Sequence, residues 1–259
     1  MISFSVYKRF TAVYFAVAVL CIVIGAVSVS RNPGKEIPLF AALMAVLVIT
    51  IFILRKIANK KFQTEVVSHL HNCNVGLYIE SLTKLLGTRR DKFEQSMYAC
   101  LSSVGYEVLG DYDSLYASCK NIKLKMHMPI YHRRMFSYYF NYKELEYAIN
   151  EADTLAALAA KEKNLKEKKI IDEMEAECRR TLRVNDGDYD EALDYFSEML
   201  KSNDPHPLIT RVSCSYAYGK LLYLTGNPEA AKEPLLFASS RGGDTKYKKN
   251  ADELLEKIG

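Results

Sequence analysis

No charged residue interrupts the run IPLFAALMAVLVITIFIL at residues 37–54, and none interrupts FTAVYFAVAVLCIVIGAVSVS at residues 10–30. A helix needs about 20 apolar residues to cross the hydrocarbon core of a bilayer, and both runs are close to that length. Neither run shows a polar face at helical spacing, which argues against buried helices of a soluble core. Because only residues 31–36 join the two runs, the sequence predicts a transmembrane hairpin over residues 1–61.

Two other interpretations of these runs stay open. The first run could begin a secretory signal at Lys8 and Arg9 and end it at the small residues 26–28. Signal sequences, however, carry an apolar region of about 7–15 residues, and this run is longer and closely followed by another. The second run is slightly short for a full crossing, so a re-entrant pair is the other alternative. We expect two full crossings.

The flanks of the two runs predict an orientation. Basic residues stand before the first run and after the second, at Lys8, Arg9, Arg55, Lys56, Lys60 and Lys61, whereas the connection carries only Arg31 and Lys35. Loops rich in Lys and Arg stay on the cytoplasmic side. We therefore expect an integral membrane protein with both termini in the cytoplasm and the bilayer as its partner through residues 10–54. The short architecture favours a bacterial inner membrane, and a eukaryotic organelle is the alternative.

The charge of the remaining chain is low. Residues 1–61 hold eight Lys or Arg and one Glu, a charge of +7, which leaves −3 of the total of +4 for residues 62–259. Nucleic-acid binding needs a concentrated basic face, so nucleic acid is not an expected partner. No phosphate loop, nucleophile elbow, dinucleotide fingerprint or zinc spacing occurs. We expect no enzymatic activity, no cofactor and no metal.

The tetrapeptide GDYD recurs, at residues 110–113 and 187–190. The second copy continues as GDYDEALDYFSEML, which places Ala192 five residues and Phe196 nine residues after Gly187. Weaker copies begin at residues 76, 140 and 226, so the sequence predicts turns at 76, 110, 140, 187 and 226. This pattern resembles the second helix of tetratricopeptide repeats. The resemblance covers most of residues 62–259 and implies an all-α, divergent tetratricopeptide-like solenoid, with a generic helical-hairpin domain as the alternative.

Two further features follow from this assignment. The aspartates of the GDYD turns are expected to cap the next helix by accepting from its exposed backbone N–H groups. Residues 154–183 show helical periodicity without Pro or Gly, and we expect one long helix there that joins two hairpins. A hairpin cannot bury its apolar face alone, so neighbouring hairpins are expected to stack into a continuous core.

The resemblance also implies a partner-binding concave face lined by the first helix of each hairpin. The ligand-facing positions of the family fall on His127 and Arg134 in the third hairpin and on Tyr216, Lys220 and Tyr223 in the last. Aromatic rings beside a basic group suit a peptide with an acidic side chain or a carboxyl end. Packing of Tyr216 and Tyr223 between hairpins is an equal alternative.

We expect a membrane-anchored adaptor that binds protein or peptide partners near the cytoplasmic face. Two alternatives belong to other classes of protein. A membrane-bound enzyme or enzyme subunit would use His127, His132 or the pair Arg133 and Arg134. A structural subunit of a membrane complex would use its spans alone.

Overall fold

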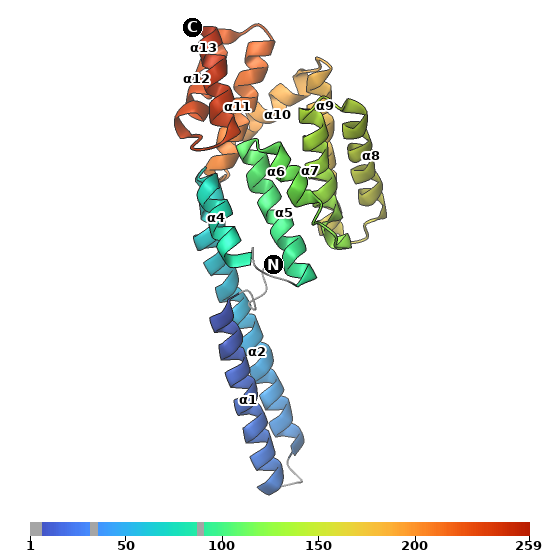
Figure 1. Cartoon of the computed structure of the whole chain (residues 1–259), viewed down its shortest axis with the longest axis vertical. Coiled ribbons are helices and arrows are strands. Elements are labelled where there is room, and N and C mark those ends of the chain that lie inside the picture. The colour runs from blue at the N-terminus through green and yellow to red at the C-terminus, as the bar shows by residue number, and fades with distance from the viewer. Residues whose placement is uncertain (1–6, 32–35, 87–90) are drawn as a thin grey trace. The chain divides into compact units, whose positions relative to one another are not determined.

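The computed structural model describes residues 7–31, 36–86 and 91–259, and all regular elements in these ranges are helices (Figure 1). The all-α class predicted from the sequence is therefore confirmed. The chain divides into two units, residues 1–68 and 69–259.

The first unit contains the helices α1 (Lys8–Arg31) and α2 (Glu36–Phe62), which pack against each other. Their apolar windows have mean hydropathies of 2.6 and 2.4, and only 6% of each window is buried. Phe15 and Phe52, for example, are 63% and 67% exposed. Both helices are thus long and apolar enough to cross a membrane. Of the predicted connection at residues 31–36, residues 32–35 lie outside the described residues, while Arg31 ends α1 and Glu36 begins α2.

A π-helical turn, η3 (Gln63–Val67), and the short α3 (Ser68–His71) follow α2. The second unit then continues through α4 (Val75–Leu86), α5 (Lys92–Leu109), α6 (Tyr112–Cys119), η4 (Lys125–His127), α7 (Met128–Asn141), α8 (Leu145–Lys161), α9 (Leu165–Asn185), α10 (Asp190–Lys201), α11 (Leu208–Leu224), α12 (Pro228–Arg241) and α13 (Lys246–Ile258). Most helices that follow each other in sequence pack as antiparallel neighbours, and α9 with α10 is the exception (Figure 1).

Five connections between these helices use the same turn. Each contains one residue with a positive φ, between 61° and 87°: Cys73, Gly110, Lys143, Gly187 and Gly226. The backbone N–H of the next residue donates to the carbonyl oxygen five positions earlier, as from Asp111 to Tyr106 at 2.9 Å. This bond closes a left-handed helix end and satisfies a carbonyl group that would otherwise lack a partner.

The turns predicted at Gly76 and Phe140 are wrong. Gly76 lies in the first turn of α4 and Phe140 near the end of α7, while the turns themselves are at Cys73 and Lys143. The search relied on glycine because glycine adopts positive φ without steric cost. At these two turns, residues with side chains occupy that conformation.

The single long helix predicted over residues 154–183 is also wrong, because α8 ends at Lys161 and α9 begins at Leu165. The side chain of Asn164 accepts from the N–H groups of Lys166 at 3.0 Å and Glu167 at 3.4 Å. An Asn in this position starts a new helix.

The predicted aspartate caps are confirmed at one of the two GDYD turns. Asp111 caps α6 by accepting from the N–H of Ser114 at 3.0 Å. At the second turn the residue in the N-cap position of α10 is Tyr189, and its side chain makes no capping bond.

The second helix of each hairpin buries a residue at a fixed distance from the turn. Five positions after the positive-φ residue stand Tyr78, Leu115, Ala148, Ala192 and Ala231, each at most 1% exposed. The regular spacing shows that one packing rule is used five times along the second unit.

The last hairpin contacts the first through Asp244, which lies between α12 and α13. Its carboxylate accepts from the N–H groups of Val75 at 2.6 Å and Gly76 at 2.7 Å, and its own N–H donates to the carbonyl of Cys73 at 3.2 Å. The carboxylate thus accepts from N–H groups that have no partner within α4, and its negative charge interacts favourably with the positive end of the helix dipole. We call these bonds the Asp244 contact. Gly243 permits it, since a Cβ there would come within 2.2 Å of the Cys73 oxygen.

Helix α13 also packs against α5, and Lys246 donates from Nζ to the hydroxyl of Tyr112 at 3.0 Å. An open array of hairpins would leave its first and last members apart. Here the two ends touch, so the second unit closes on itself.

Replacing Asp244 by Ala removes a capping carboxylate from α4, and we expect a loss of about 1–2 kcal/mol in the free energy of unfolding of the second unit. Thermal unfolding of the full chain in detergent, followed by circular dichroism, measures this loss. Glu256→Ala, an exposed change on α13, is the control and should leave the transition in place. Equal effects of the two substitutions would contradict a stabilising role of the contact.

Candidate functional site

Two adjacent arginines of α7 lie in a network of ion pairs that joins three helices. Arg133 donates from Nε and Nη2 to the two carboxylate oxygens of Glu177 on α9, at 3.1 and 2.5 Å, and from Nη1 to Glu107 on α5, at 3.3 Å. Arg134 pairs with the other oxygen of Glu107. The Ser137 hydroxyl also donates to Glu107, at 2.6 Å. The predicted site residue Arg134 therefore connects α7 to α5.

The charges in this network compensate one another. Burial is the largest single influence on the pKa of Arg133 and acts to lower it, but the charge and hydrogen bonds of Glu177, with smaller contributions from Cys178 and Tyr247, together outweigh burial and raise that pKa. Burial likewise acts to raise the pKa of Glu177, yet its pairing with Arg133 holds that pKa below the usual value. Burial dominates at Arg134 and lowers its pKa.

Two other predicted residues lie away from any shared site. His127 stands just before α7, with Nδ1 2.9 Å from the Ser96 hydroxyl of α5. Burial lowers the pKa of His127, so its ring is neutral at pH 7. Tyr223 is partly buried against the apolar core of the last three helices.

The remaining two predicted residues, Tyr216 and Lys220, line one groove. This groove has a volume of about 410 Å³ and lies between α9, α10 and α11. We call it the α9–α11 groove. Its lining includes Val184 on α9 and Phe196 and Met199 on α10, so much of its surface is apolar. Such a volume is in the range of binding pockets, about 300–1,000 Å³.

The α9–α11 groove carries cations that the described residues do not neutralise. Arg180 places its guanidinium 3.6 Å from the centre of the Tyr195 ring, and its buried Nε has no hydrogen-bond partner. Lys220 is exposed, and no ion pair or hydrogen bond within residues 36–86 and 91–259 involves it. Loss of solvation and repulsion by Lys143 lower the pKa of Lys220.

Glu177 also reaches the groove, and its charge attracts that of Arg180, but its hydrogen bonds go to Arg133. Both of its carboxylate oxygens already accept from Arg133. The groove therefore combines apolar walls with an excess of positive charge, which favours an acidic ligand.

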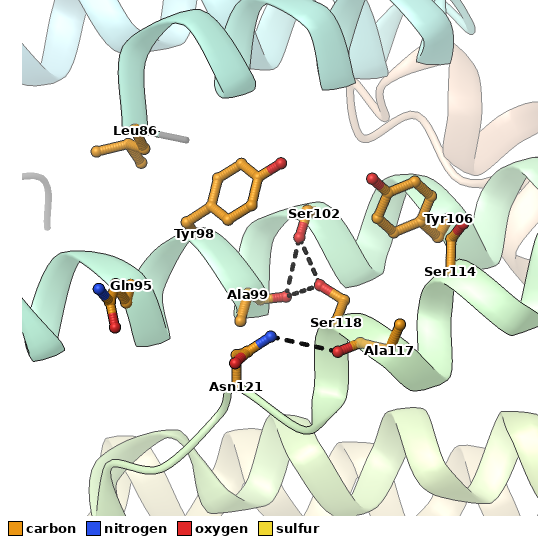
Figure 2. Close-up of a pocket in the computed structure, with 10 residues that line it drawn as sticks. All are labelled: Leu86, Gln95, Tyr98, Ala99, Ser102, Tyr106, Ser114, Ala117, Ser118 and Asn121. Carbon is orange, nitrogen blue, oxygen red and sulfur yellow. Dashed lines mark hydrogen bonds between the residues drawn. The ribbon is translucent and has the colours of Figure 1, made fainter. Parts of the chain in front are cut away.

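Figure 2 shows a second pocket, of about 500 Å³, where α4, α5 and α6 meet. None of its lining side chains is charged. The hydroxyls of Ser102 and Ser118 are 2.6 Å apart, and each donates to the carbonyl of Ala99. Its serines thus find partners within the protein, and no predicted site residue lines it. A neutral polar molecule would suit this chemistry, but no unpaired group calls for one.

The sequence interpretation missed Arg180, Tyr195, Phe196 and Met199 as groove residues. Their signal was present in α9 and in the GDYDEALDYFSEML segment, where they recur at helical spacing. Helical spacing alone, however, does not separate residues that line a groove from residues that enter a core.

No family model, no curated protein and no solved structure matches this chain. The tetratricopeptide resemblance stays a prediction, and the candidate site depends on its own geometry.

The lowered pKa of Glu177 gives the stability of the chain a definite pH dependence. Its ion pair contributes fully above the pKa of the unfolded carboxyl, about 4.3, and is lost as the pH falls through the lower folded value. We expect the melting temperature of the full chain to fall between about pH 5 and pH 3.

Glu177→Gln should lower the melting temperature at pH 7 and reduce its fall in acid. Glu173→Gln, on an exposed part of the same helix, is the matched control. If both variants follow the wild-type pH curve, the pair does not contribute.

Proposed function

We propose that this protein is a membrane-anchored adaptor that holds an acidic segment of a protein partner in the α9–α11 groove. One observation carries the proposal: Arg180 and Lys220 lie in a largely apolar groove, and neither forms an ion pair with a carboxylate of the described chain. The buried Nε of Arg180 has no hydrogen-bond partner, and burying such a group is costly unless a partner arrives. A carboxylate of a partner would supply that charge.

The two apolar helices of the first unit support the anchoring part of the proposal. As part of this proposal, α1 and α2 cross a bacterial inner membrane and both termini are cytoplasmic. The adaptor then works in the thin layer next to the bilayer. Anchoring raises its effective concentration toward other membrane proteins, so contacts that are weak in solution become sufficient.

The alternative of an enzyme receives less support from the residues it would need. His132 is engaged with Glu151, at 2.6 Å between Nδ1 and Oε2. Arg133 and Arg134 pair with glutamates of α5 and α9. A structural subunit would need the membrane helices but not the groove, so changes in the groove separate that alternative from the adaptor.

Membrane insertion predicts that carbonate at high pH leaves the chain in the membrane pellet. A reporter fused after Gly259 should be active only on the cytoplasmic side, because the basic flanks stay there. A peripheral protein of the same vesicles serves as the extraction control. Release of the chain by carbonate, or an active reporter outside the cell, would refute the anchoring.

The groove is tested by the double substitution Tyr216→Ala with Lys220→Glu in the full-length chain. We expect capture of the partner by crosslinking in intact membranes to fall about tenfold or more, since an attractive charge becomes repulsive. Lys249→Glu makes the same charge change on exposed α13 and should not reduce capture. Thermal unfolding of each variant shows whether the fold is intact. Unchanged capture by a folded double variant would favour the structural role.

A further inference from the structure

The α9–α11 groove lies where a packing contact of the array is missing. The first helices of successive hairpins pack on each other, α5 on α7 and α7 on α9. The next pair, α9 and α11, makes no comparable contact, and α10 touches α9 over only a short stretch while it packs along α11. The fourth hairpin is thus splayed, with α10 between the two helices (Figure 1).

The same hairpin leaves its own apolar face only partly covered. Nine positions after the turn, the other four hairpins have a fully buried residue: Leu82, Cys119, Ala152 and Leu235. The fourth hairpin has Phe196 there, which is only partly buried. Met199, twelve positions after its turn, is partly buried, as is Leu85 of the first hairpin, whereas Ile122, Leu155 and Ala238 are buried at that position. Both residues line the groove.

We propose that the α9–α11 groove binds an amphipathic helix of a partner protein, with an apolar face and flanking carboxylates. This inference rests on the proposed function and specifies its ligand. The apolar face of the helix covers Phe196 and Met199, and the carboxylates lie against Arg180 and Lys220. The bound helix supplies the contact that α9 and α11 lack.

The arrangement of the groove residues explains why the ligand is a helix. On α9 they are residues 177, 180, 181 and 184, which is the spacing of one helix face. On α11 they run from Thr210 to Leu221 at the same spacing, over a length of about 16 Å at 1.5 Å per residue. Two such ridged faces accept the side chains of a third helix between them. A helix of about three turns would match the length of α11 that lines the groove.

Charge selects an acidic helix. Arg180 and Lys220 are on opposite walls, and Lys143 adds a further positive charge near Lys220. Glu177 is neutralised by Arg133 and repels an incoming carboxylate only weakly. A basic helix would bring more positive charge into the groove and is excluded by repulsion.

The test places a photoreactive benzoylphenylalanine at Met199 of the full-length chain in intact membranes. The same residue at Leu236, an exposed position on α12, is the control. After irradiation, mass spectrometry identifies the crosslinked segment. We expect one partner segment to be crosslinked by the probe at position 199 and not by the probe at position 236. It should have apolar residues at helical spacing and Asp or Glu on its flanks.

Charge exchange tests the pairing directly. Lys220→Glu should reduce the Met199 crosslink about tenfold, and Lys249→Glu should leave it unchanged. In the partner, the acidic residue that faces position 220 is then replaced by Lys. This change should restore the crosslink from position 199 in the chain that carries Lys220→Glu. Rescue by that change alone identifies the carboxylate that pairs with Lys220.

Other outcomes refute the inference in distinguishable ways. A proline-rich, extended or basic segment at Met199 would overturn the acidic helix but leave the adaptor function standing. A crosslinked product of twice the chain mass would show that a second copy fills the groove. Crosslinks from Leu236 without any from Met199 would overturn both the acidic helix and the proposed use of the groove.

Discussion

The ion pairs of Arg133 are the interaction on which the arrangement of the second unit depends. One guanidinium contacts Glu107 of α5 and Glu177 of α9, and so it fixes the first helices of three hairpins. Burying such charges costs energy that only complete pairing offsets, and removal of one partner is therefore far more harmful than replacement of the whole network. The network holds α9 in place through Glu177, which also lines the groove. The α9 wall of the groove is thus fixed by ion pairs to α5 and α7.

The other wall is positioned separately. Helices α11, α12 and α13 share an apolar core in which Val212, Ala231 and Leu235 are fully buried. This core and the ion-pair network order different groups of helices, with α10 between them, and Tyr247 of the core lies close enough to Arg133 and Arg134 to influence their charges. The groove is therefore not a defect in one core but the boundary between two packed groups of helices. Binding sites commonly form at such boundaries, because each side keeps its structure when a ligand enters.

Much of the fold could be predicted from local sequence. The apolar runs identified the two long helices, and the glycines at 110, 187 and 226 identified three of the five turns. Prediction from local sequence failed where a residue adopts a conformation, or starts a helix, without the usual sequence signal. Cys73 and Lys143 adopt positive φ without the glycine signal, and Asn164 divides a segment that looks continuous by periodicity.

The candidate site was less predictable, for a different physical reason. The positions implied by the tetratricopeptide resemblance include Tyr216 and Lys220, which do line one groove. They also include Arg134, whose guanidinium is already paired with Glu107. A buried pair such as Arg134 with Glu107 depends on helices brought together by the fold, and sequence spacing does not reveal it. The groove itself results from a contact that is not made. A pattern of residues predicts contacts, and it gives no direct sign of their omission.

The contact of Asp244 with α4 has a mechanical consequence for the groove. Helix α5 packs on α7 and α7 on α9, while α13 packs on both α11 and α5. With the Asp244 contact, these helices form a ring that is open only between α9 and α11. In an open array the gap could widen by a small hinge motion at almost no cost. In a closed ring, moving α9 away from α11 must strain or break one of the other helix contacts. A groove held in this way resists widening, so under the proposed function it would select a ligand by thickness as well as by charge.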